Sequence, residues 1–300
     1  MISTTSLVKN KKMSNLTWFG VGGCSKYYFQ PSSEENLISF LKDNQLNLQI
    51  YPLGAGSNII IRDRGFNGII IHFNKLKEIF IDKQGIITAY CGAMDADVAR
   101  FARNHSKTGL EFLIGIPGTI GGGIKMNSGA YGSEIKNILI DVTAINKNGI
   151  LKKFSVKDLQ LDYRTNKLSH EWMFLKARFK SNDGSKEQIQ KKMKDIIQSR
   201  KISQPTGQKT GGSTFMNGKN FKAWELIDNS GCRGLKNGGA IISNKHCNFI
   251  INENNATATD IETLGEIVRK KVFKKTGKKL KWAIKICLLY TSDAADEMRR

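Results

Sequence analysis

The sequence Gly115-Ile116-Pro117-Gly118-Thr119-Ile120-Gly121-Gly122-Gly123 decides the fold, together with Leu53-Gly54-Ala55-Gly56-Ser57-Asn58 about sixty residues before it. Glycine lacks a Cβ, so it adopts positive φ and lets backbone N–H groups approach a phosphate. The side chains of Ser57, Asn58 and Thr119 add hydrogen-bond donors beside those amides. One such stretch alone is more often a tight loop between strands. The pair predicts two halves of one site for the diphosphate of a cofactor.

Two common nucleotide-binding patterns are missing from the sequence. The Rossmann pattern G-x-G-x-x-G needs a third glycine, and Gly54-Ala55-Gly56 lacks it at the required spacing. Gly20-Val21-Gly22-Gly23 is not followed by the required residues either, and no Walker sequence is present. A diphosphate cofactor would therefore be held on loops rather than at the start of one βαβ helix.

Length and composition are those of a globular chain. With 300 residues, 40% of them hydrophobic, the chain can bury a sizeable core and is expected to divide into two or three lobes. The first residues carry Lys9, Lys11 and Lys12 but no apolar signal region, and no apolar run approaches the roughly 18 residues of a membrane span. We therefore expect a soluble cytoplasmic protein with no membrane partner.

The cysteines and histidines do not form a ligand pattern. Five cysteines include no C-x-x-C pair, and four histidines are scattered along the chain. This usage is typical of reduced thiols rather than of a disulfide framework or a zinc site. The sequence predicts no metal.

The net charge of +21 suggests nucleic acid as a partner, because clustered basic residues neutralise phosphates. Most of the 47 basic residues are lysines, however, and the lysines of 186–194 and 270–279 fall on segments with helical periodicity. Such lysines are typical of solvated helix faces. We therefore expect no nucleic-acid partner, although the positive field would attract anionic small substrates such as nucleotides.

The hydrophobic pattern predicts an α+β chain. Residues 49–53, 68–73 and 86–89 have the composition of short strands, and residues 33–43 and 95–105 have helical spacing. A charged helix over 186–201 precedes Gln204-Pro205-Thr206-Gly207, which marks a domain boundary. The predicted division is a two-lobed region over 1–195, a smaller α/β domain over 196–287, and an unmatched tail over 288–300.

The last predicted helix has local start and stop signals. Its apolar face carries residues 261, 264, 267, 268 and 272, with Thr257 or Thr259 as the N-cap and Gly277 as the stop. A terminal strand over 280–286 follows, with Leu280, Trp282, Ile284 and Ile286 on one face.

Several motifs, in order from about Leu16 to Ile286, resemble the UDP-N-acetylenolpyruvoylglucosamine reductase family in its compact subtype. They are Thr17-Trp18-Phe19-Gly20-Val21-Gly22-Gly23, the two glycine stretches, Gly109-Leu110-Glu111-Phe112, Met126-Asn127-Ser128-Gly129-Ala130-Tyr131-Gly132, Tyr163-Arg164, Gly211-Gly212-Ser213-Thr214-Phe215 with Asn217, and Gly238-Gly239-Ala240 before His246 and Asn248. Each motif alone is weak, but the ordered set rarely arises by chance.

The resemblance implies a vanillyl-alcohol-oxidase-type (PCMH-type) FAD-binding region of two lobes and a third lobe for the UDP-sugar. It implies that FAD is bound non-covalently, that NADPH is the co-substrate, and that UDP-N-acetylglucosamine enolpyruvate is reduced to UDP-N-acetylmuramate for peptidoglycan. Hydride would pass from NADPH to the flavin and then to the enolpyruvyl group. The expected protein is a monomer. The FAD-binding residues implied are Gly54, Ala55, Gly56, Ser57, Asn58, Gly115, Ile116, Pro117, Gly118, Thr119, Gly121, Gly122, Asn127, Ala130 and Tyr131.

The resemblance also assigns the catalytic and substrate-binding residues. Reduction of an enolpyruvyl double bond needs a proton donor and a group that stabilises negative charge beside the carboxylate. Ser213 resembles the proton donor and Arg164 the carboxylate-binding arginine, while Asn217 and Tyr163 resemble substrate-binding residues. A loop or cap serine and a surface ion-pair arginine are the alternatives. His246 also matches a family position, but we do not predict it to be catalytic.

Two departures from the family occur near the end of the sequence. The family's terminal strand carries a Glu that joins the proton transfer, and Ala283 stands at its position, so we expect slow sugar reduction. Residues 288–300 contain no Lys, Asn or Ile and match nothing in the family, which indicates either foreign sequence or an ordinary polar tail. Another FAD-dependent oxidoreductase on the same scaffold, and a non-catalytic binder of flavin or UDP-sugar, are the alternative functions.

Overall fold

The computed structural model describes residues 7–287, and the chain in it forms two compact units. Among the described residues, the first unit consists of 7–8, Tyr28–Ala55 and Ile70–Arg200, and the second of Lys9–Tyr27, Gly56–Ile69 and 201–287. The predicted division at residues 195 and 196 stays a prediction, and the predicted tail over 288–300 lies outside the described residues. No helix in the described range is long and apolar enough to span a membrane.

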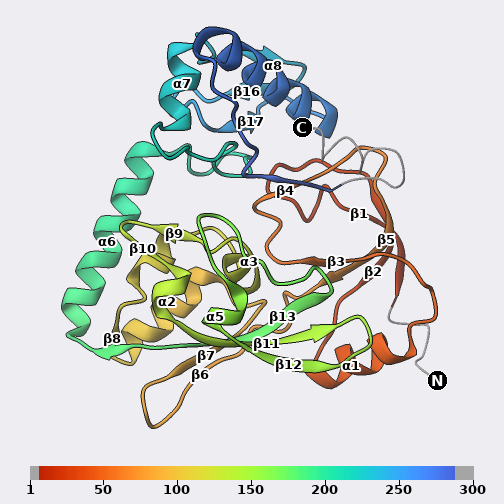
Figure 1. Cartoon of the computed structure of the whole chain (residues 1–300), viewed down its shortest axis with the longest axis vertical. Helices are drawn as coiled ribbons and strands as arrows, with labels where there is room; N and C mark the ends of the chain where they lie inside the picture. Colours follow the sequence, from red (N-terminus) through yellow and green to blue (C-terminus); the bar gives the residue numbers. More distant parts are fainter. Residues whose placement is uncertain (1–6, 288–300) are drawn as a thin grey trace. The chain divides into compact units, whose positions relative to one another are not determined.

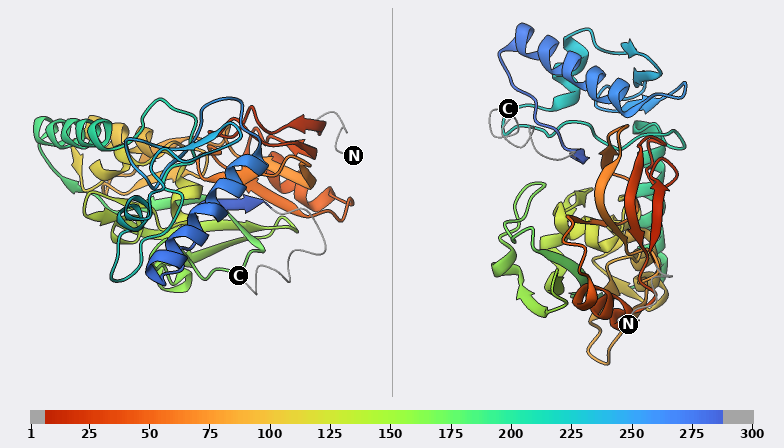
Figure 2. Two further views of the ribbon diagram at one scale, coloured as in Figure 1. Left: turned by 90° about the horizontal axis from the view of Figure 1, so that it is seen from above. Right: turned by 90° about the vertical axis from the view of Figure 1, so that its right-hand side faces the viewer.

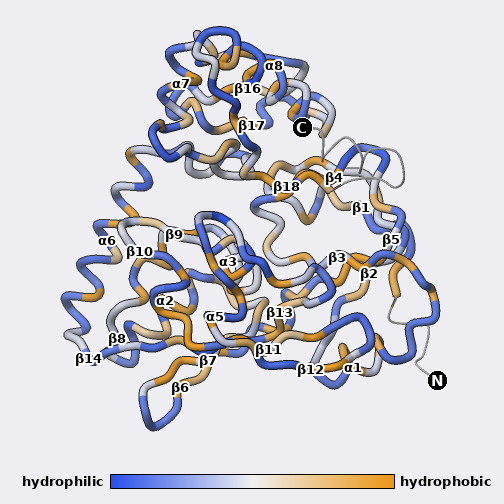
Figure 3. Tube along the Cα trace, in the orientation of Figure 1, coloured by the Kyte–Doolittle hydropathy of each residue, from blue (hydrophilic) through white to orange (hydrophobic). Residues whose placement is uncertain are grey.

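The centre of the first unit is an antiparallel sheet that has, within the described residues, five strands in the order β12-β11-β13-β7-β6 (Figure 1). The strands are β6 (Ile79–Ile81), β7 (Ile87–Tyr90), β11 (Leu139–Asn146), β12 (Leu151–Ser155) and β13 (Trp172–Phe179). Val142, Ala144 and Ala177 are fully or almost fully buried, so the inward face of this sheet is apolar. In Figure 3 the hydrophobic colour concentrates on these central strands.

Helices complete the core of the first unit. They are α2 (Asp95–Asn104), the 3₁₀ helix η2 (Glu111–Gly115) and α3 (Ile120–Lys125), with α3 packed on β7 and β13 and α2 packed on η2. Their buried apolar residues belong to one cluster with those of the strands. The predicted helix over 95–105 is confirmed as α2, because its Val98, Ala99 and Ala102 face the core.

Other predicted helices are also present. α1 (Glu34–Asp43) begins after Ser33, whose side chain accepts a hydrogen bond from the backbone of Asn36. α6 (Lys186–Ser203) buries only Ile189 and Met193, so its lysines face solvent as predicted. The shorter elements are α4 (Ile135–Ile138), α5 (Val156–Leu159), β8 (Lys107–Thr108), β9 (Gly129–Ala130), β10 (Ser133–Glu134) and β14 (Asn182–Asp183).

A further sheet has the strand order β1-β2-β5-β3. Its strands are β1 (Val8–Lys12), β2 (Cys24–Phe29), β3 (Ile50–Leu53) and β5 (Phe66–His72). The predicted strands over 49–53, 68–73 and 86–89 are therefore confirmed as β3, β5 and β7, with ends that differ by one or two residues. The first predicted glycine stretch follows β3 directly.

The second unit places the long helix α8 (Ala258–Thr276) against a small antiparallel sheet (Figure 2, right view). The strands of this sheet are β15 (Lys236–Asn237), β16 (Ala240–Ile242) and β17 (Ile250–Asn252), and α7 (Ala223–Asn229) contacts α8. Thr257 is the N-cap of α8 in a capping box with Asp260, and Gly277 ends the helix with φ of 67°. Both predicted helix signals are confirmed, with Thr257 rather than Thr259 as the cap.

The predicted continuous strand over 280–286 is wrong. The regular strand is β18 (Lys285–Cys287), which pairs in parallel with β4 (Ile59–Ile61), whereas Trp282 forms an isolated antiparallel bridge with Phe215. The segment changes its hydrogen-bonding partner between Ala283 and Lys285, which interrupts a regular ladder. Leu280 and Ile284 are buried, as the predicted apolar face requires, and Ala283 is buried as well, with 9% of its surface exposed.

Candidate functional site

The two glycine stretches meet in the first unit. A Cβ placed on Gly54 would lie only 2.3 Å from Oγ1 of Thr119, so no other residue fits at position 54 without displacing that hydroxyl. Oγ1 of Thr119 is also the nearest atom to a Cβ placed on Gly122, at 3.8 Å. We call Gly54, Thr119 and Gly122 the glycine cluster. Their approach is what a site built from both stretches requires.

The three glycines of α3 have different surroundings. A Cβ on Gly121 would lie 2.9 Å from that of Cys91, and a Cβ on Gly123 would lie 3.2 Å from a carboxylate oxygen of Asp95. These two glycines therefore allow α3 to pack closely on its neighbours. Gly122 is exposed and has only the hydroxyl of Thr119 nearby. The Gly122 face of α3 is the one open to a ligand.

Thr119 carries a hydroxyl suited to a phosphate. The residue is 3% exposed, and its Oγ1 has no hydrogen-bond partner among residues 7–287. Although Thr119 occupies the N-cap position of α3, its side chain does not cap the helix. Because a buried hydroxyl without a partner is costly, this atom is a candidate for hydrogen bonding to a ligand.

The remaining residues of the two stretches are divided between the two units. Ala55 belongs to the first unit and Ser57 to the second, and both are half-buried after β3. Ile116, Pro117 and Gly118 are half-buried between η2 and α3. The carbonyl of Gly118 accepts a hydrogen bond from the backbone of Asp95, which fixes the path of the second stretch.

Arg164 is held by the loop that contains Asn127. Its guanidinium donates to the carbonyl of Gly129 at 2.9 Å and to that of Asn127 at 3.4 Å. Asn127, Tyr131 and Arg164 all have left-handed backbones, with φ of 38°, 52° and 57°. Strained residues of this kind are often found at functional sites. The predicted residues Asn127, Ala130, Tyr131 and Arg164 therefore lie in one local arrangement.

Tyr131 and Tyr163 present aromatic surface beside this arrangement. The ring of Tyr131 packs over Gly115, where a Cβ would lie 2.8 Å from Cε2. Tyr163 is 47% exposed, and its ring lies 5.5 Å from the guanidinium carbon of Arg164. Asn127, by contrast, uses its buried side chain to bond Glu134, the carbonyl of Asp162 and the backbone of Lys136. Its role toward a cofactor stays a prediction.

In the second unit the loop after Gly211 presents Ser213 to solvent. Gly211 packs against Phe19, where a Cβ would lie 2.4 Å from the ring, and Gly212 has φ of 79°. Both positions thus require glycine. The Ser213 side chain is exposed and has no hydrogen bond within the described part of the chain. Its hydroxyl is free to act on a ligand.

Asn248 holds the residues that follow Ser213, a role that the sequence did not predict. Its amide donates to the carbonyl of Phe215 and accepts from the N–H of Phe215, both at 2.9 Å. The carbonyl of Asn248 also accepts from the N–H of Thr214 at 2.8 Å. In the sequence, the signal for this role was the position of Asn248 two residues after His246.

Ala283 lies beside this loop. Its N–H donates to the carbonyl of Thr214 at 2.9 Å, and Nδ2 of Asn58 donates to its own carbonyl at 3.1 Å. The N–H of Lys285 in turn donates to the carbonyl of Asn58. The end of the first glycine stretch, the residue after Ser213 and Ala283 are therefore hydrogen-bonded neighbours in the second unit.

Two further predicted positions serve partly structural roles. Oδ1 of Asn217 accepts from the N–H of Ala223 at the start of α7, which leaves its Nδ2 without a partner among residues 7–287. Nδ1 of His246 lies 3.2 Å from the N–H of Asn248, and burial lowers the pKa of the imidazole. The neutral ring accepts this bond through Nδ1, which fits a positioning role.

Gly56 of the first glycine stretch has φ of 67° and packs against the backbone of Leu16.

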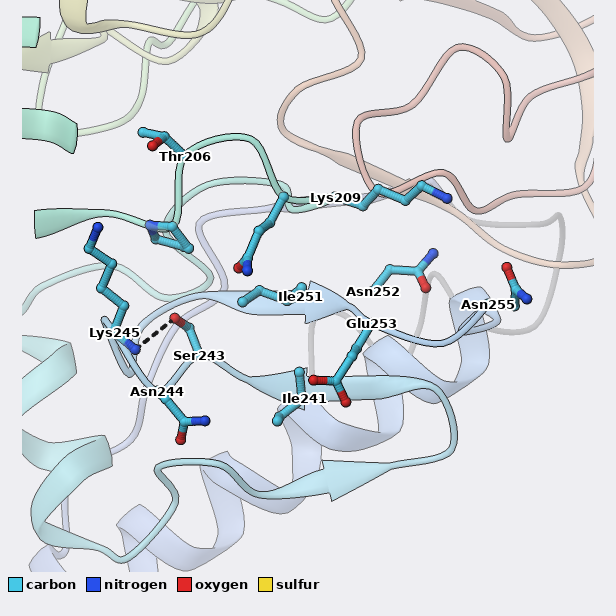
Figure 4. Close-up of a pocket in the computed structure, with 12 residues that line it drawn as sticks. Thr206, Lys209, Ile241, Ser243, Asn244, Lys245, Ile251, Asn252, Glu253 and Asn255 are labelled. Atoms are coloured by element: carbon cyan, nitrogen blue, oxygen red, sulfur yellow. Dashed lines mark hydrogen bonds between the residues drawn. The ribbon is translucent and has the colours of Figure 1, made fainter. Parts of the chain in front are cut away.

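A pocket of about 540 Å³ lies elsewhere in the second unit (Figure 4). Ile241 and Ile251, which are paired across β16 and β17, contribute an apolar surface, and Thr206, Lys209 and Lys245 are among its polar residues. None of the predicted site residues lines it. Residues 7–287 also contain no cluster of three metal-ligating side chains.

Two family models match separate parts of the chain. Residues 25–155 match the family described as "FAD binding domain". Residues 204–287 match the family described as "UDP-N-acetylenolpyruvoylglucosamine reductase, C-terminal domain". The first match includes both glycine stretches, and the second includes Ser213 and Ala283.

Curated relatives match almost the whole chain. The UDP-N-acetylenolpyruvoylglucosamine reductase of Orientia tsutsugamushi (strain Boryong) is 48% identical over 282 residues, covering 93% of each chain. That of Rickettsia akari (strain Hartford) is 45% identical over 282 residues, covering 93% of this chain and 94% of the relative. The crystal structure of the UDP-N-acetylenolpyruvylglucosamine reductase from Thermus caldophilus matches with a TM-score of 0.80 at 27% identity, covering 94% of this chain and 98% of the other.

These matches confirm the predicted fold class and cofactor. The fold is α+β, with a vanillyl-alcohol-oxidase-type FAD-binding region followed by a smaller C-terminal α/β region. FAD is the cofactor. The unpartnered hydroxyl of Thr119 and the absence of side chains at Gly54 and Gly122 fit its diphosphate.

Proposed function

Because the chain belongs to the UDP-N-acetylenolpyruvoylglucosamine reductase family, as its sequence motifs predicted, we propose that it reduces UDP-N-acetylglucosamine enolpyruvate with NADPH as the reductant. It is an FAD-dependent oxidoreductase. The product would be UDP-N-acetylmuramate for peptidoglycan. We further propose that the second half of this reaction is impaired, because Ala283 stands where the family has a catalytic Glu.

The residues proposed to hold FAD are those of the two glycine stretches. The hydroxyl of Thr119 would donate to a diphosphate oxygen, while Gly54 and Gly122 leave room for the phosphates. When bound, FAD supplies hydride transfer from the nicotinamide to the enolpyruvyl group. The chain's own task is to bind and orient the reactants and to move one proton.

Ser213 is the proposed proton donor. Hydride addition to the enolpyruvyl double bond leaves negative charge at the carbon beside the carboxylate, and this carbon must receive a proton. The exposed hydroxyl of Ser213 has no competing hydrogen bond among the described residues, and its loop is held by Asn248. A serine hydroxyl is a weak acid, so it needs a neighbouring group to restore its proton.

Arg164 is proposed to bind the substrate carboxylate. A guanidinium presents several N–H donors in a planar fork, which suits a carboxylate that gains charge during the reaction. The carbonyls of Gly129 and Asn127 fix the orientation of this side chain through two of its nitrogens. Tyr163 and Asn217 are proposed to contact the substrate beside these two residues.

The position of Ala283 is the observation that carries the proposed impairment. The N–H of Ala283 donates to the carbonyl of Thr214, and Thr214 directly follows Ser213 in the chain. A longer side chain at position 283 would therefore begin beside the residue next to the proposed proton donor. A methyl group cannot relay a proton. Loss of a positioned acid or base typically slows a proton transfer by about 10² to 10⁴.

A stopped-flow experiment with two half-reactions tests the proposal. The FAD-loaded protein is mixed anaerobically with NADPH, and then with UDP-N-acetylglucosamine enolpyruvate, while flavin absorbance is recorded. We expect rapid bleaching and slow recovery. Ala283→Glu should accelerate the recovery by about 10² or more and leave the bleaching rate unchanged. Lys281→Glu is the control, because it adds a carboxylate at an exposed position on the same segment.

The outcomes separate the proposed function from its alternatives. Recovery in the original protein as fast as its bleaching would refute the impairment but not the reductase. Bleaching without recovery in both the original protein and Ala283→Glu would mean that the enolpyruvyl compound does not reoxidise the reduced flavin. This result would favour another FAD-dependent oxidoreductase with a different oxidising substrate. Ala283 itself favours one second candidate, a non-catalytic binder of flavin or UDP-sugar, which predicts no bleaching by NADPH.

A further inference from the structure

Asp95 is a buried carboxylate with no assigned task. It is the first residue of α2 and is 0% exposed. Neither of its side-chain oxygens has a hydrogen-bond partner within residues 7–287. Charged groups are almost never fully buried unless they are paired, so a carboxylate here would be very unfavourable. A protonated carboxyl can occupy this position at much lower cost.

The carboxyl lies against α3 at Gly123, the residue that follows Gly122 of the glycine cluster. One of its oxygens would lie 3.2 Å from a Cβ on Gly123, whereas Gly122 points toward Thr119. Any movement that brought water to Asp95 would have to separate α2 from Gly123. Such a movement would displace α3, the helix that directly follows Thr119.

Backbone hydrogen bonds connect Asp95 to the second glycine stretch. The N–H of Asp95 donates to the carbonyl of Gly118 at 3.0 Å, and the N–H of Ile120 donates to that of Ala93 at 2.9 Å. Met94 and Thr119 form an antiparallel bridge between these two bonds. The start of α2 and the residues around Thr119 are therefore joined and cannot move independently.

No charge in the surroundings offsets the burial of Asp95. Burial raises the pKa of its carboxyl to about 8, and desolvation is the only cause of this shift. The ionisable groups on the elements that contact α2 or α3, among described residues, are Tyr90 on β7 and Cys91 after it, Asp97, Arg100 and Arg103 on α2, Lys107 on β8, Glu111 on η2, Lys125 on α3, Lys176 and Arg178 on β13, and Lys136 on α4 with Glu134 before it. Lys107 pairs with Asp183, Lys176 with Glu34 and Arg178 with Asp141. Asp97 pairs with Arg100 and Lys136 with Glu134, so these charges are satisfied elsewhere.

We propose that Asp95 is a positioning residue of the FAD site, whose side chain must carry a proton for α2 to pack on Gly123 and for Thr119 to keep its place beside the diphosphate. Loss of this proton in mildly alkaline solution requires hydration of the carboxylate and weakens FAD binding. This inference rests on the proposed diphosphate site.

The experiment measures the dissociation constant of FAD between pH 6.5 and pH 9.0, from the fluorescence of released flavin. In the original protein we expect the dissociation constant to rise about tenfold between pH 7 and pH 9. Asp95→Asn should remove this rise, because the amide has nearly the same shape and does not ionise. Asp95→Leu, which is also uncharged, provides a second test if the amide variant does not fold. Asp97→Asn on the exposed face of α2 should retain the rise.

Two results would overturn the inference. One is a dissociation constant in the original protein that does not change with pH. The other is the same rise in the Asp95→Asn or Asp95→Leu variant as in the original protein. Failure of the proposed diphosphate site looks different, because then Thr119→Ala binds FAD as tightly as the original protein at every pH. Since the readout is flavin release, the slow chemistry expected from Ala283 does not affect it.

Discussion

The side-chain amide of Asn248 forms two hydrogen bonds with the backbone of Phe215. The amide oxygen of Asn248 accepts from the N–H of Phe215, and its amide nitrogen donates to the Phe215 carbonyl. Both residues are buried, so water cannot replace either bond. The loop that presents Ser213 is fixed by this arrangement two residues after the serine.

The first prediction follows from this pair. Asn248→Ala should lower the free energy of unfolding by about 2 to 4 kcal/mol, because it leaves a buried N–H and a buried carbonyl unpaired. Chemical denaturation measures this change. Asn220→Ala, at an exposed position, is the control and should change stability by less than about 0.5 kcal/mol. Equal effects of the two variants would contradict the role of Asn248.

Ser213→Ala should separate chemistry from stability. The hydroxyl has no hydrogen bond among the described residues, so we expect a change in unfolding free energy within about 0.5 kcal/mol. Reduction of FAD by NADPH should keep its rate. In the Ala283→Glu background, where reoxidation by the enolpyruvyl substrate is expected to be fast, Ser213→Ala should slow reoxidation by about 10² or more. Stopped-flow absorbance measures both rates. An unchanged reoxidation rate would exclude Ser213 as the proton donor.

Gly54→Ala should disturb the FAD site through one atom of Thr119. The new Cβ would collide with Oγ1 of Thr119 at 2.3 Å, so we expect a lower melting temperature and weaker FAD binding. Adding Thr119→Ala removes that oxygen and should restore the melting temperature of the flavin-free protein, but not the affinity for FAD. Calorimetry and flavin titration distinguish the two effects. Failure of the second substitution to restore stability would contradict this contact.

The pH dependence of stability should also report on Asp95. Its carboxyl has a pKa of about 8 when folded and an ordinary value near 4 when unfolded, so the folded chain binds the extra proton between these values. Stability therefore declines as pH rises from about 4 to about 8 and changes no further through this group above that range. Asp95→Leu removes this loss. Its stabilisation relative to the original protein, measured by urea denaturation, should be greater at pH 8 than at pH 4.5.

Features encoded by neighbouring residues were predictable from the sequence. Thr257 with Asp260, and Gly277 at the other end, define α8 because capping depends only on residues a few positions apart. The glycine stretches were equally readable, since the conformations open to glycine depend on its own missing side chain. Their composition also predicted that the two stretches form one site, and Gly54 of the first stretch does approach Oγ1 of Thr119 in the second.

Features that depend on distant partners were not predictable in this way. The segment around Ala283 alternates like a strand, yet its hydrogen bonds go first to Thr214 and then to Asn58, and no local pattern encodes this exchange. Asp95 looks like an ordinary acidic residue in the first turn of a helix, a common and favourable choice. Only the packing of Gly123 against it shows that it is buried.

The hydrogen bonds from residues 281–285 to Asn58 and to residues 214–216 have a consequence for biosynthesis. The ribosome makes Asn58 and Ser213 long before it makes Ala283. A nascent chain therefore holds Ser213, the proposed proton donor, without the segment that fixes the neighbouring backbone. We expect the second unit to acquire its final structure only after residues 281–285 have left the ribosomal exit tunnel.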